Sequence, residues 1–280
     1  MMNKSQLKEL FLNHRFAPLK RFGENYLIDN NIRDKILREA AIKRNDTVLE
    51  IGPGLGALTI DLAKTGAAIA AVEKDRKAFD ILKDIVAEDY PNLKLINSDI
   101  LDFDIGKAAP EGGLKVIGNL PYYITTPVIE LLISNRFLIS SALIVIQKEV
   151  ARRLLARPGS KDYSSLSCFV QYFTQPQYIH TISRTSFFPK PEVDSSLVKL
   201  SMLKAPRAAV KDEELFFRIV RGSFNQRRKS LVNSLSRKEV LDRPKAEVTG
   251  ILEGIGIDPS ARPEDISIES FAKITNAFTA

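Results

Sequence analysis

The stretch "TVLEIGPGLGALTIDLAKTGAAIAAVEKD", residues 47–75, decides the fold class of this chain. Two short apolar runs, 47–52 and 67–75, have the composition of buried parallel strands. Between them lies a glycine-rich turn followed by the amphipathic segment 57–66, which ends at Gly66 as helices commonly do. A strand, a glycine turn, a helix and a second strand form the repeating unit of an open α/β sheet.

The same alternation continues along the chain. Further apolar strands are expected at 93–99, 114–121 and 141–147, and the segment 76–91 between two of the strands is amphipathic. Helices are expected near 148–156 and 165–174. The segments 177–187 and 194–203 alternate apolar and polar residues and predict an antiparallel pair at the end of the sheet.

The chain is expected to form two domains. It has 280 residues, and after a linker beginning near residue 204 the pattern is helical only. We therefore expect an α/β domain over 1–203, with a mostly parallel sheet, and a small all-α domain over 204–280.

Composition narrows the functional classes. The formal net charge is +7 and the pI is about 9.3, which favours a polyanionic partner. The single cysteine, Cys168, excludes an internal disulfide and a cysteine-based zinc site, and its apolar surroundings predict a buried structural thiol. The single cysteine also favours a reducing, cytoplasmic setting, and no metal site is expected. No window is apolar enough to span a membrane.

Chemistry is expected at the carboxyl ends of the strands, where open α/β sheets bind ligands. Gly52 and Gly54 allow a ligand to approach the backbone closely. Glu73 can accept hydrogen bonds from a ribose diol, and Asp99 can accept one from an exocyclic amine such as that of adenine. Each acid alone also fits a helix N-cap or a solvated strand end.

Together these strand ends resemble the cofactor site of class I S-adenosylmethionine-dependent methyltransferases. The fourth strand end, Asn119-Leu120-Pro121-Tyr122, fits the D/N-x-P-Y/F motif of enzymes that methylate exocyclic amines of bases. The resemblance implies that the Asn119 side chain and the Leu120 carbonyl accept the hydrogens of an N6 amine. Pro121 would fix that carbonyl, and Tyr122 would stack on the base.

Within that superfamily the chain resembles the ribosomal RNA adenine N6,N6-dimethyltransferases of the small-subunit (16S) type. The segments that carry this resemblance are 22–32, 187–198, 224–235 and 256–274. It implies that Asn25 and Leu27 contact the cofactor, as Asn119 also would. Phe187 would face the target base opposite Tyr122, although the adjacent Phe188 could take that place.

The C-terminal region contains one long stretch of a single charge sign. No acidic residue occurs from Leu215 through Lys238. Positive charge without negative charge favours an RNA backbone over an ordinary solvated face. The residues expected to bind RNA are Arg221, Arg227, Arg228 and Lys229.

The resemblance implies an enzyme that dimethylates two adjacent adenines near the 3′ end of 16S ribosomal RNA, using S-adenosyl-L-methionine. It would act as a monomer on an immature small subunit. Two alternatives remain: a large-subunit (23S) adenine dimethylase, and a non-catalytic ribosome assembly factor on the same fold.

Overall fold

The computed structural model describes residue 9 and residues 25–86, 89–108, 112–226 and 229–279. The chain forms two compact units. The first comprises residues 1–151 and 177–202, and the second comprises residues 152–176 and 203–280. Each unit is considered below by itself.

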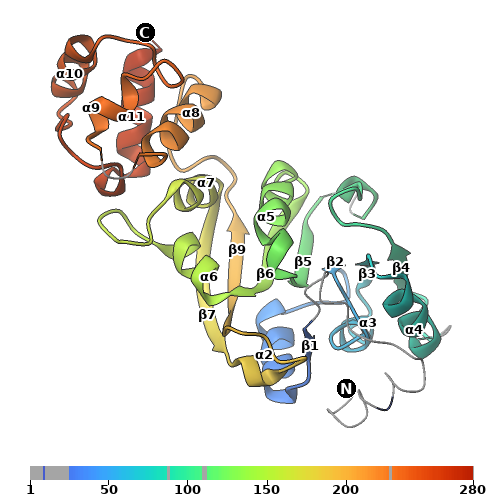
Figure 1. Cartoon of the computed structure of the whole chain (residues 1–280). Helices are drawn as coiled ribbons and strands as arrows, with labels where there is room; N and C mark the ends of the chain where they lie inside the picture. The colour runs from blue at the N-terminus through green and yellow to red at the C-terminus, as the bar shows by residue number, and fades with distance from the viewer. Residues whose placement is uncertain (1–8, 10–24, 87–88, 109–111, 227–228, 280) are drawn as a thin grey trace. The chain divides into compact units, whose positions relative to one another are not determined.

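A seven-stranded sheet organises the first unit, in the order β4-β3-β2-β5-β6-β9-β7 (Figure 1). Adjacent strands from β4 through β6 run parallel, and β9 runs antiparallel to β6. The strand bounds are β2 (Thr47–Ile51), β3 (Ala68–Glu73), β4 (Leu93–Asn97), β5 (Leu114–Asn119), β6 (Ile139–Gln147), β7 (Thr174–Ile182) and β9 (Ser195–Met202). This mixed sheet confirms the predicted fold class.

The register of the strands brings the predicted site together. Ile51 pairs with Val72 of β3 and with Gly118 of β5, so three neighbouring strands end at the same edge. The residues that follow, including Gly52, therefore lie beside Glu73 and Asn119.

Helices alternate with these strands, and two of them begin at a side chain that accepts hydrogen bonds from their first turn. They are α2 (Asn30–Ala40), α3 (Thr59–Ala63), α4 (Arg76–Val86) and α5 (Thr125–Ser134). The Asp29 side chain accepts hydrogen bonds from the backbone N–H groups of Asn31 and Ile32 at the start of α2. The Asp75 side chain does the same for Ala78 in α4.

Both faces of the sheet are covered. On one face, Val48, Ile69 and Ile117 pack in one hydrophobic cluster with Ile36 of α2 and Leu62 of α3. The alternate strand residues Leu49 and Val116 are also buried, as expected for strands covered on both sides.

The prediction of a strand over 177–187 was wrong at its C-terminal end. Strand β7 begins at Thr174 and stops at Ile182. The Ser183 side chain then accepts a hydrogen bond from the N–H of Thr185, and a 3-10 turn follows. Phe187–Phe188 forms the separate strand β8, which pairs antiparallel with β1 (Tyr26–Leu27).

The second unit is built from helices. The chain enters it within α6 (Lys148–Leu155), and the helices that follow are α7 (Ser165–Phe173), α8 (Glu213–Phe224), α9 (Leu231–Leu235), α10 (Lys245–Gly254) and α11 (Ile268–Phe278). Helix α7 belongs to this unit because its aromatic face packs on α8: Tyr172 stacks on Phe216, with ring centroids 4.7 Å apart. The sequence interpretation had assigned residues 152–176 to the first domain.

The Cys168 thiol is fully buried in α7, as predicted. Burial raises its pKa to about 12, against the opposing effect of its hydrogen bond with the Tyr163 hydroxyl. The thiol is therefore inert at neutral pH.

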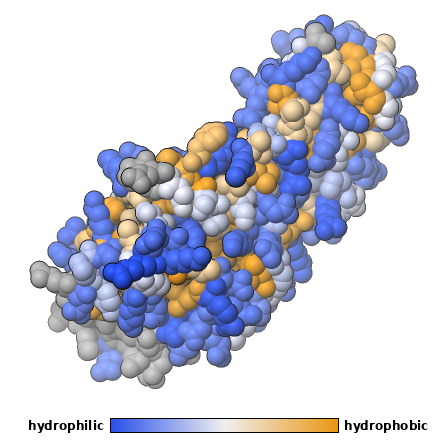
Figure 2. Space-filling model, turned by 180° about the vertical axis from the view of Figure 1, so that it is seen from behind, coloured by the Kyte–Doolittle hydropathy of each residue, from blue (hydrophilic) through white to orange (hydrophobic). Residues whose placement is uncertain are grey.

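Hydrophobic residues at the surface lie among hydrophilic ones (Figure 2). In the part of the chain that the structure covers, five large apolar side chains are exposed: Leu101, Tyr123, Phe137, Tyr178 and Val193. None of the helices described is long and apolar enough to cross a membrane.

Candidate functional site

One pocket lies at the carboxyl edge of the parallel strands, and it gathers all the residues of the first unit that the sequence nominated. Its walls come from the ends of β2, β3 and β5 and from the β1–β8 ribbon. The nominated residues that line it are Asn25, Leu27, Gly52, Gly54, Glu73, Asp99, Asn119, Leu120, Pro121, Tyr122 and Phe187.

The turn after β2 requires glycine. Gly52 and Gly54 have φ angles of 66° and 56°, in the left-handed region that other residues adopt only with strain. A Cβ atom on Gly54 would lie 2.9 Å from the Tyr26 ring. Both glycines line the pocket, so their backbone borders it; that a ligand approaches them stays a prediction.

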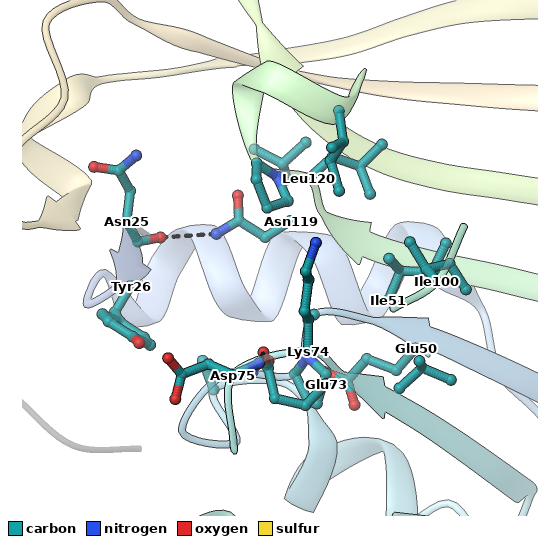
Figure 3. A pocket seen from close by; sticks show the side chains of 18 of the residues that line it. Asn25, Tyr26, Glu50, Ile51, Glu73, Lys74, Asp75, Ile100, Asn119 and Leu120 are labelled. Carbon is teal, nitrogen blue, oxygen red and sulfur yellow. Dashed lines mark hydrogen bonds between the residues drawn. The ribbon is translucent and has the colours of Figure 1, made fainter. Parts of the chain in front are cut away.

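Glu73 at the end of β3 fastens this turn. Its Oε2 accepts the N–H of Gly54 at 2.9 Å, and its Oε1 accepts the N–H of Asp75 at 2.8 Å. A carboxylate oxygen can accept more than one hydrogen bond, so these two bonds do not exclude a further one from a ligand hydroxyl. The carboxylate is thus held in position by two backbone N–H groups, one from the turn after β2 and one from the turn after β3. Figure 3 shows Glu73 among the residues that line the pocket.

Asp99, after β4, forms an ion pair that the sequence did not indicate. Its Oδ2 lies 2.5 Å from Lys74 Nζ, and its Oδ1 accepts the N–H of Leu101 at 3.0 Å. Burial alone would raise the pKa of Asp99, but these bonds and the Lys74 charge outweigh it and hold the pKa below its usual value. Asp99 is therefore a carboxylate at neutral pH.

Asn119 ends β5 with its side chain fixed in one orientation. Its Nδ2 donates to the backbone carbonyl of Asn25 at 2.8 Å. A carbonyl can only accept, so the amide nitrogen must face Asn25 and the Oδ1 oxygen is turned away (Figure 3). Within the described part of the chain, no donor bonds to this oxygen. The pocket thus contains a positioned acceptor.

Tyr122 and Phe187 both line the pocket. Tyr122 lies in the 3-10 turn after β5, and its hydroxyl lies 2.9 Å from that of Ser195 on β9. Phe187 is 3% exposed, whereas Phe188 packs instead with Leu55 and Ile81. Of the two adjacent phenylalanines, Phe187 is the one that borders this pocket.

Glu50 is a site residue that sequence reasoning overlooked. It lies on β2 immediately before the turn, lines the pocket and is 2% exposed. Burial raises its pKa to about 8, with a smaller opposing effect of Thr59 and a further rise from the Glu73 carboxylate. Its Oε2 has no hydrogen-bond partner among the described residues. The sequence did contain a signal for this residue, because an acidic side chain inside an apolar strand is unusual unless it has a function.

The residues nominated for RNA binding lie in the second unit. Arg221 on α8 and Lys229 after it are exposed. Arg227 and Arg228 lie outside the described residues.

Comparison with known proteins matches nearly the whole chain to one family. The family model described as "Ribosomal RNA adenine dimethylase" matches residues 16–280. A protein of Moorella thermoacetica named ribosomal RNA small subunit methyltransferase A is 44% identical over 268 residues, covering 92% of each chain. One of the same name from Geobacillus thermodenitrificans is 41% identical, covering 96% of this chain and 94% of the relative.

Solved structures agree with the fold. The crystal structure of a dimethyladenosine transferase from Plasmodium falciparum has a TM-score of 0.76 at 28% identity, covering 89% of this chain and 95% of that one. The 23S rRNA methyltransferase ErmE has a TM-score of 0.71 at 24% identity, covering 91% and 100%, and shares the fold. The chain belongs to the ribosomal RNA adenine dimethylase family.

Proposed function

We propose that this protein dimethylates the N6 amines of two adjacent adenines near the 3′ end of small-subunit ribosomal RNA. It acts as a monomer in the cytoplasm, on an immature small subunit. The chain is a methyltransferase whose methyl donor is S-adenosylmethionine. The small-subunit assignment is supported by relatives of that name, at 40–44% identity over nearly the full length of each chain.

The residues of the pocket fit this donor. Gly52 and Gly54 open the backbone to a ligand, the fixed Glu73 carboxylate suits the ribose hydroxyls, and Asp99 suits the adenine amine. The buried Glu50 Oε2, which bonds to none of the described residues, is a further polar group available to a ligand. When bound, S-adenosylmethionine supplies an electrophilic methyl group on a sulfonium sulfur. Asn25 and Leu27 would close the pocket over it.

The proposed reaction rests on one observation. The Asn25 carbonyl binds the amide nitrogen of Asn119, which leaves the Asn119 Oδ1 oxygen available as an acceptor. An N6 amine is a poor nucleophile because its lone pair is delocalised into the purine ring. If Asn119 Oδ1 accepts one N–H and the Leu120 carbonyl accepts the other, the nitrogen becomes pyramidal and its lone pair is directed at the methyl carbon. Neither oxygen takes the proton, because the alkylated nitrogen is strongly acidic and releases it to water.

The neighbouring residues position the base for this step. Pro121, with φ −56° and ψ 135°, restricts the backbone that carries the Leu120 carbonyl. Tyr122 and Phe187 offer aromatic rings to the adenine, and such stacking contributes about 1–3 kcal/mol per base. Orientation of this kind acts mainly on the chemical step.

The helical region over 204–280 is proposed to bind the RNA backbone. The exposed Arg221 and Lys229 would contact phosphates, as would Arg227 and Arg228 from their sequence position. Such contacts supply affinity without reading the RNA sequence.

The test is methylation of purified small and large subunits with labelled S-adenosylmethionine, followed by mass mapping of the modified nucleotides. We expect label in small-subunit RNA only, on two adjacent adenines. Label confined to large-subunit RNA would refute the proposal in favour of the 23S alternative.

A further inference from the structure

The helical second unit contains a hollow of its own, which the proposed reaction does not use. It has a volume of about 350 Å³ and is bordered by the end of α6, by α7, by the segment after β9 and by the start of α11. We call it the Arg157–Arg207 hollow. The polar side chains that line it are Arg157, Tyr163, Gln171, Gln175, Arg207 and Glu269.

Arg207 is held at the wall of this hollow. Its Nε donates to the Gln171 backbone carbonyl at 2.8 Å, and its Nη2 donates to Gln175 Oε1 at 3.0 Å. Its own backbone N–H donates to the Tyr172 carbonyl at 2.8 Å. The Nη1 group has no acceptor among the described residues, so the fixed guanidinium retains donors for a ligand.

Positive charge is in excess at the hollow. Arg157 is exposed, and in the described part of the chain its side chain makes no hydrogen bond or ion pair. Among the described residues that line the hollow, Glu269 is the one acidic residue, and it forms no ion pair with Arg157 or Arg207. Because two guanidinium groups and one carboxylate line the hollow, it favours the binding of an anionic ligand.

The chemistry of the lining favours a nucleotide over a bare anion. Guanidinium groups match phosphate oxygens, which they can bind through two hydrogen bonds. Glu269 would repel a phosphate but can accept a hydrogen bond from a ribose 2′-hydroxyl or a base amine. The Gln171 amide nitrogen already donates to the carbonyls of Leu154 and Ala156, so its oxygen is an acceptor as well. The volume lies within the range of sites for small organic ligands.

We propose that the Arg157–Arg207 hollow binds one nucleotide of the RNA substrate, outside the adenines that react. This inference rests on the proposed function in that it takes ribosomal RNA as the substrate. Arg157 and Arg207 bind the phosphate, and Glu269 accepts from the ribose or the base.

The test uses Arg157→Glu. The Arg157 side chain bonds to none of the described residues, so its replacement should leave the fold intact. The matched control is Arg243→Glu, the same charge change at another exposed arginine of this unit, which does not line the hollow and pairs with Glu247 at the surface. We would measure RNA binding over a salt series, methylation kinetics and S-adenosylmethionine binding. We expect Arg157→Glu to weaken RNA binding about tenfold and to lower the log–log salt slope by about one. Its kcat and donor affinity should stay unchanged. Arg243→Glu should bind RNA like the wild type.

A second measurement locates the contact directly. Cys168 is fully buried, so Arg157→Cys can be labelled selectively with a photoreactive group. Irradiation should crosslink it to one site in the RNA, while labelled Arg243→Cys should not crosslink. If both charge reversals weaken binding equally, or if Arg157→Cys does not crosslink, the hollow is not an RNA site. Failure of the wild type to methylate small subunits would instead refute the proposed function.

Discussion

The Tyr122 hydroxyl lies 2.9 Å from the Ser195 hydroxyl, which ties the turn after β5 to the first residue of β9. Ser195 is fully buried and pairs with Gln147 of β6, so it belongs to the rigid sheet. The Tyr122 ring is therefore held through its hydroxyl, and the sheet restricts how that ring can turn within the pocket that it lines.

Ser195→Ala should loosen this ring without touching the donor site. We expect kcat/KM for RNA to fall about two- to tenfold, corresponding to the ~0.5–1.5 kcal/mol of one hydrogen bond, with unchanged donor affinity. Tyr122→Phe should have a similar effect, and the double variant should be little worse than either. Ser196→Ala is the matched control, because this neighbouring buried serine points to the other face of the sheet. Additive losses in the double variant would show that the two hydroxyls act independently.

Asn119→Ala should remove the acceptor for the N6 amine. Loss of one oriented group at a transition state costs about 2.7–4 kcal/mol, so we expect single-turnover methylation to slow about 100- to 1,000-fold. Binding of S-adenosylmethionine, measured by calorimetry, should weaken far less than methylation, because Glu73 and Asp99 would still contact the donor. Methylation at the wild-type rate would remove Asn119 from the mechanism.

Asp99→Ala should weaken the binding of S-adenosylmethionine rather than slow the methyl transfer itself. A hydrogen bond to a charged group contributes about 1.5–3 kcal/mol, so we expect the Kd for S-adenosylmethionine to rise about 10- to 100-fold. Lys74→Met is the control, because it removes the partner and leaves the carboxylate. The Lys74 side chain is 43% exposed, so the ion pair contributes at most about 1 kcal/mol and the Kd should move less than about fivefold. An unchanged Kd for Asp99→Ala would contradict the proposed adenine contact.

The edge of the sheet that carries the site could be predicted from sequence because its signals are local. Each apolar strand is followed at once by its chemical group: Gly52 after β2, Asp99 after β4, Asn119 at the end of β5. Parallel strands bring such groups to one edge whatever the rest of the chain does.

The contacts that position these groups join residues far apart in sequence, and no local pattern announces them. The Asn25 carbonyl that orients Asn119 is 94 residues away, and Ser195 is 73 residues from Tyr122. The resemblance assigned Asn25 to the cofactor, which stays a prediction; the structure adds that the Asn25 backbone carbonyl accepts a hydrogen bond from the Asn119 amide. The β1–β8 ribbon was missed because it also joins residues far apart in sequence. In addition, strands of two residues show no alternation of apolar and polar side chains.

Glu50 should make stability depend on pH. Its pKa is raised to about 8 in the folded protein, so the folded state keeps a proton that the unfolded chain loses near its ordinary value of 4.5. The folded state therefore binds more protons, and the free energy of unfolding falls as pH rises between these values, by about 1.4 kcal/mol per pH unit. Above about pH 8 this effect levels off.

Glu50→Gln keeps the shape of the side chain but cannot ionise, so it should abolish this decline. Urea unfolding without the donor, at several pH values from about 5 to 8.5, measures it. We expect the variant to be more stable than the wild type at the upper end, with the difference shrinking toward acid. Glu253→Gln, at an exposed position on α10, serves as the control and should follow the wild type. Parallel curves for Glu50→Gln and the wild type would mean that Glu50 is already ionised in the folded protein, and that Glu73 tolerates a second charge beside it.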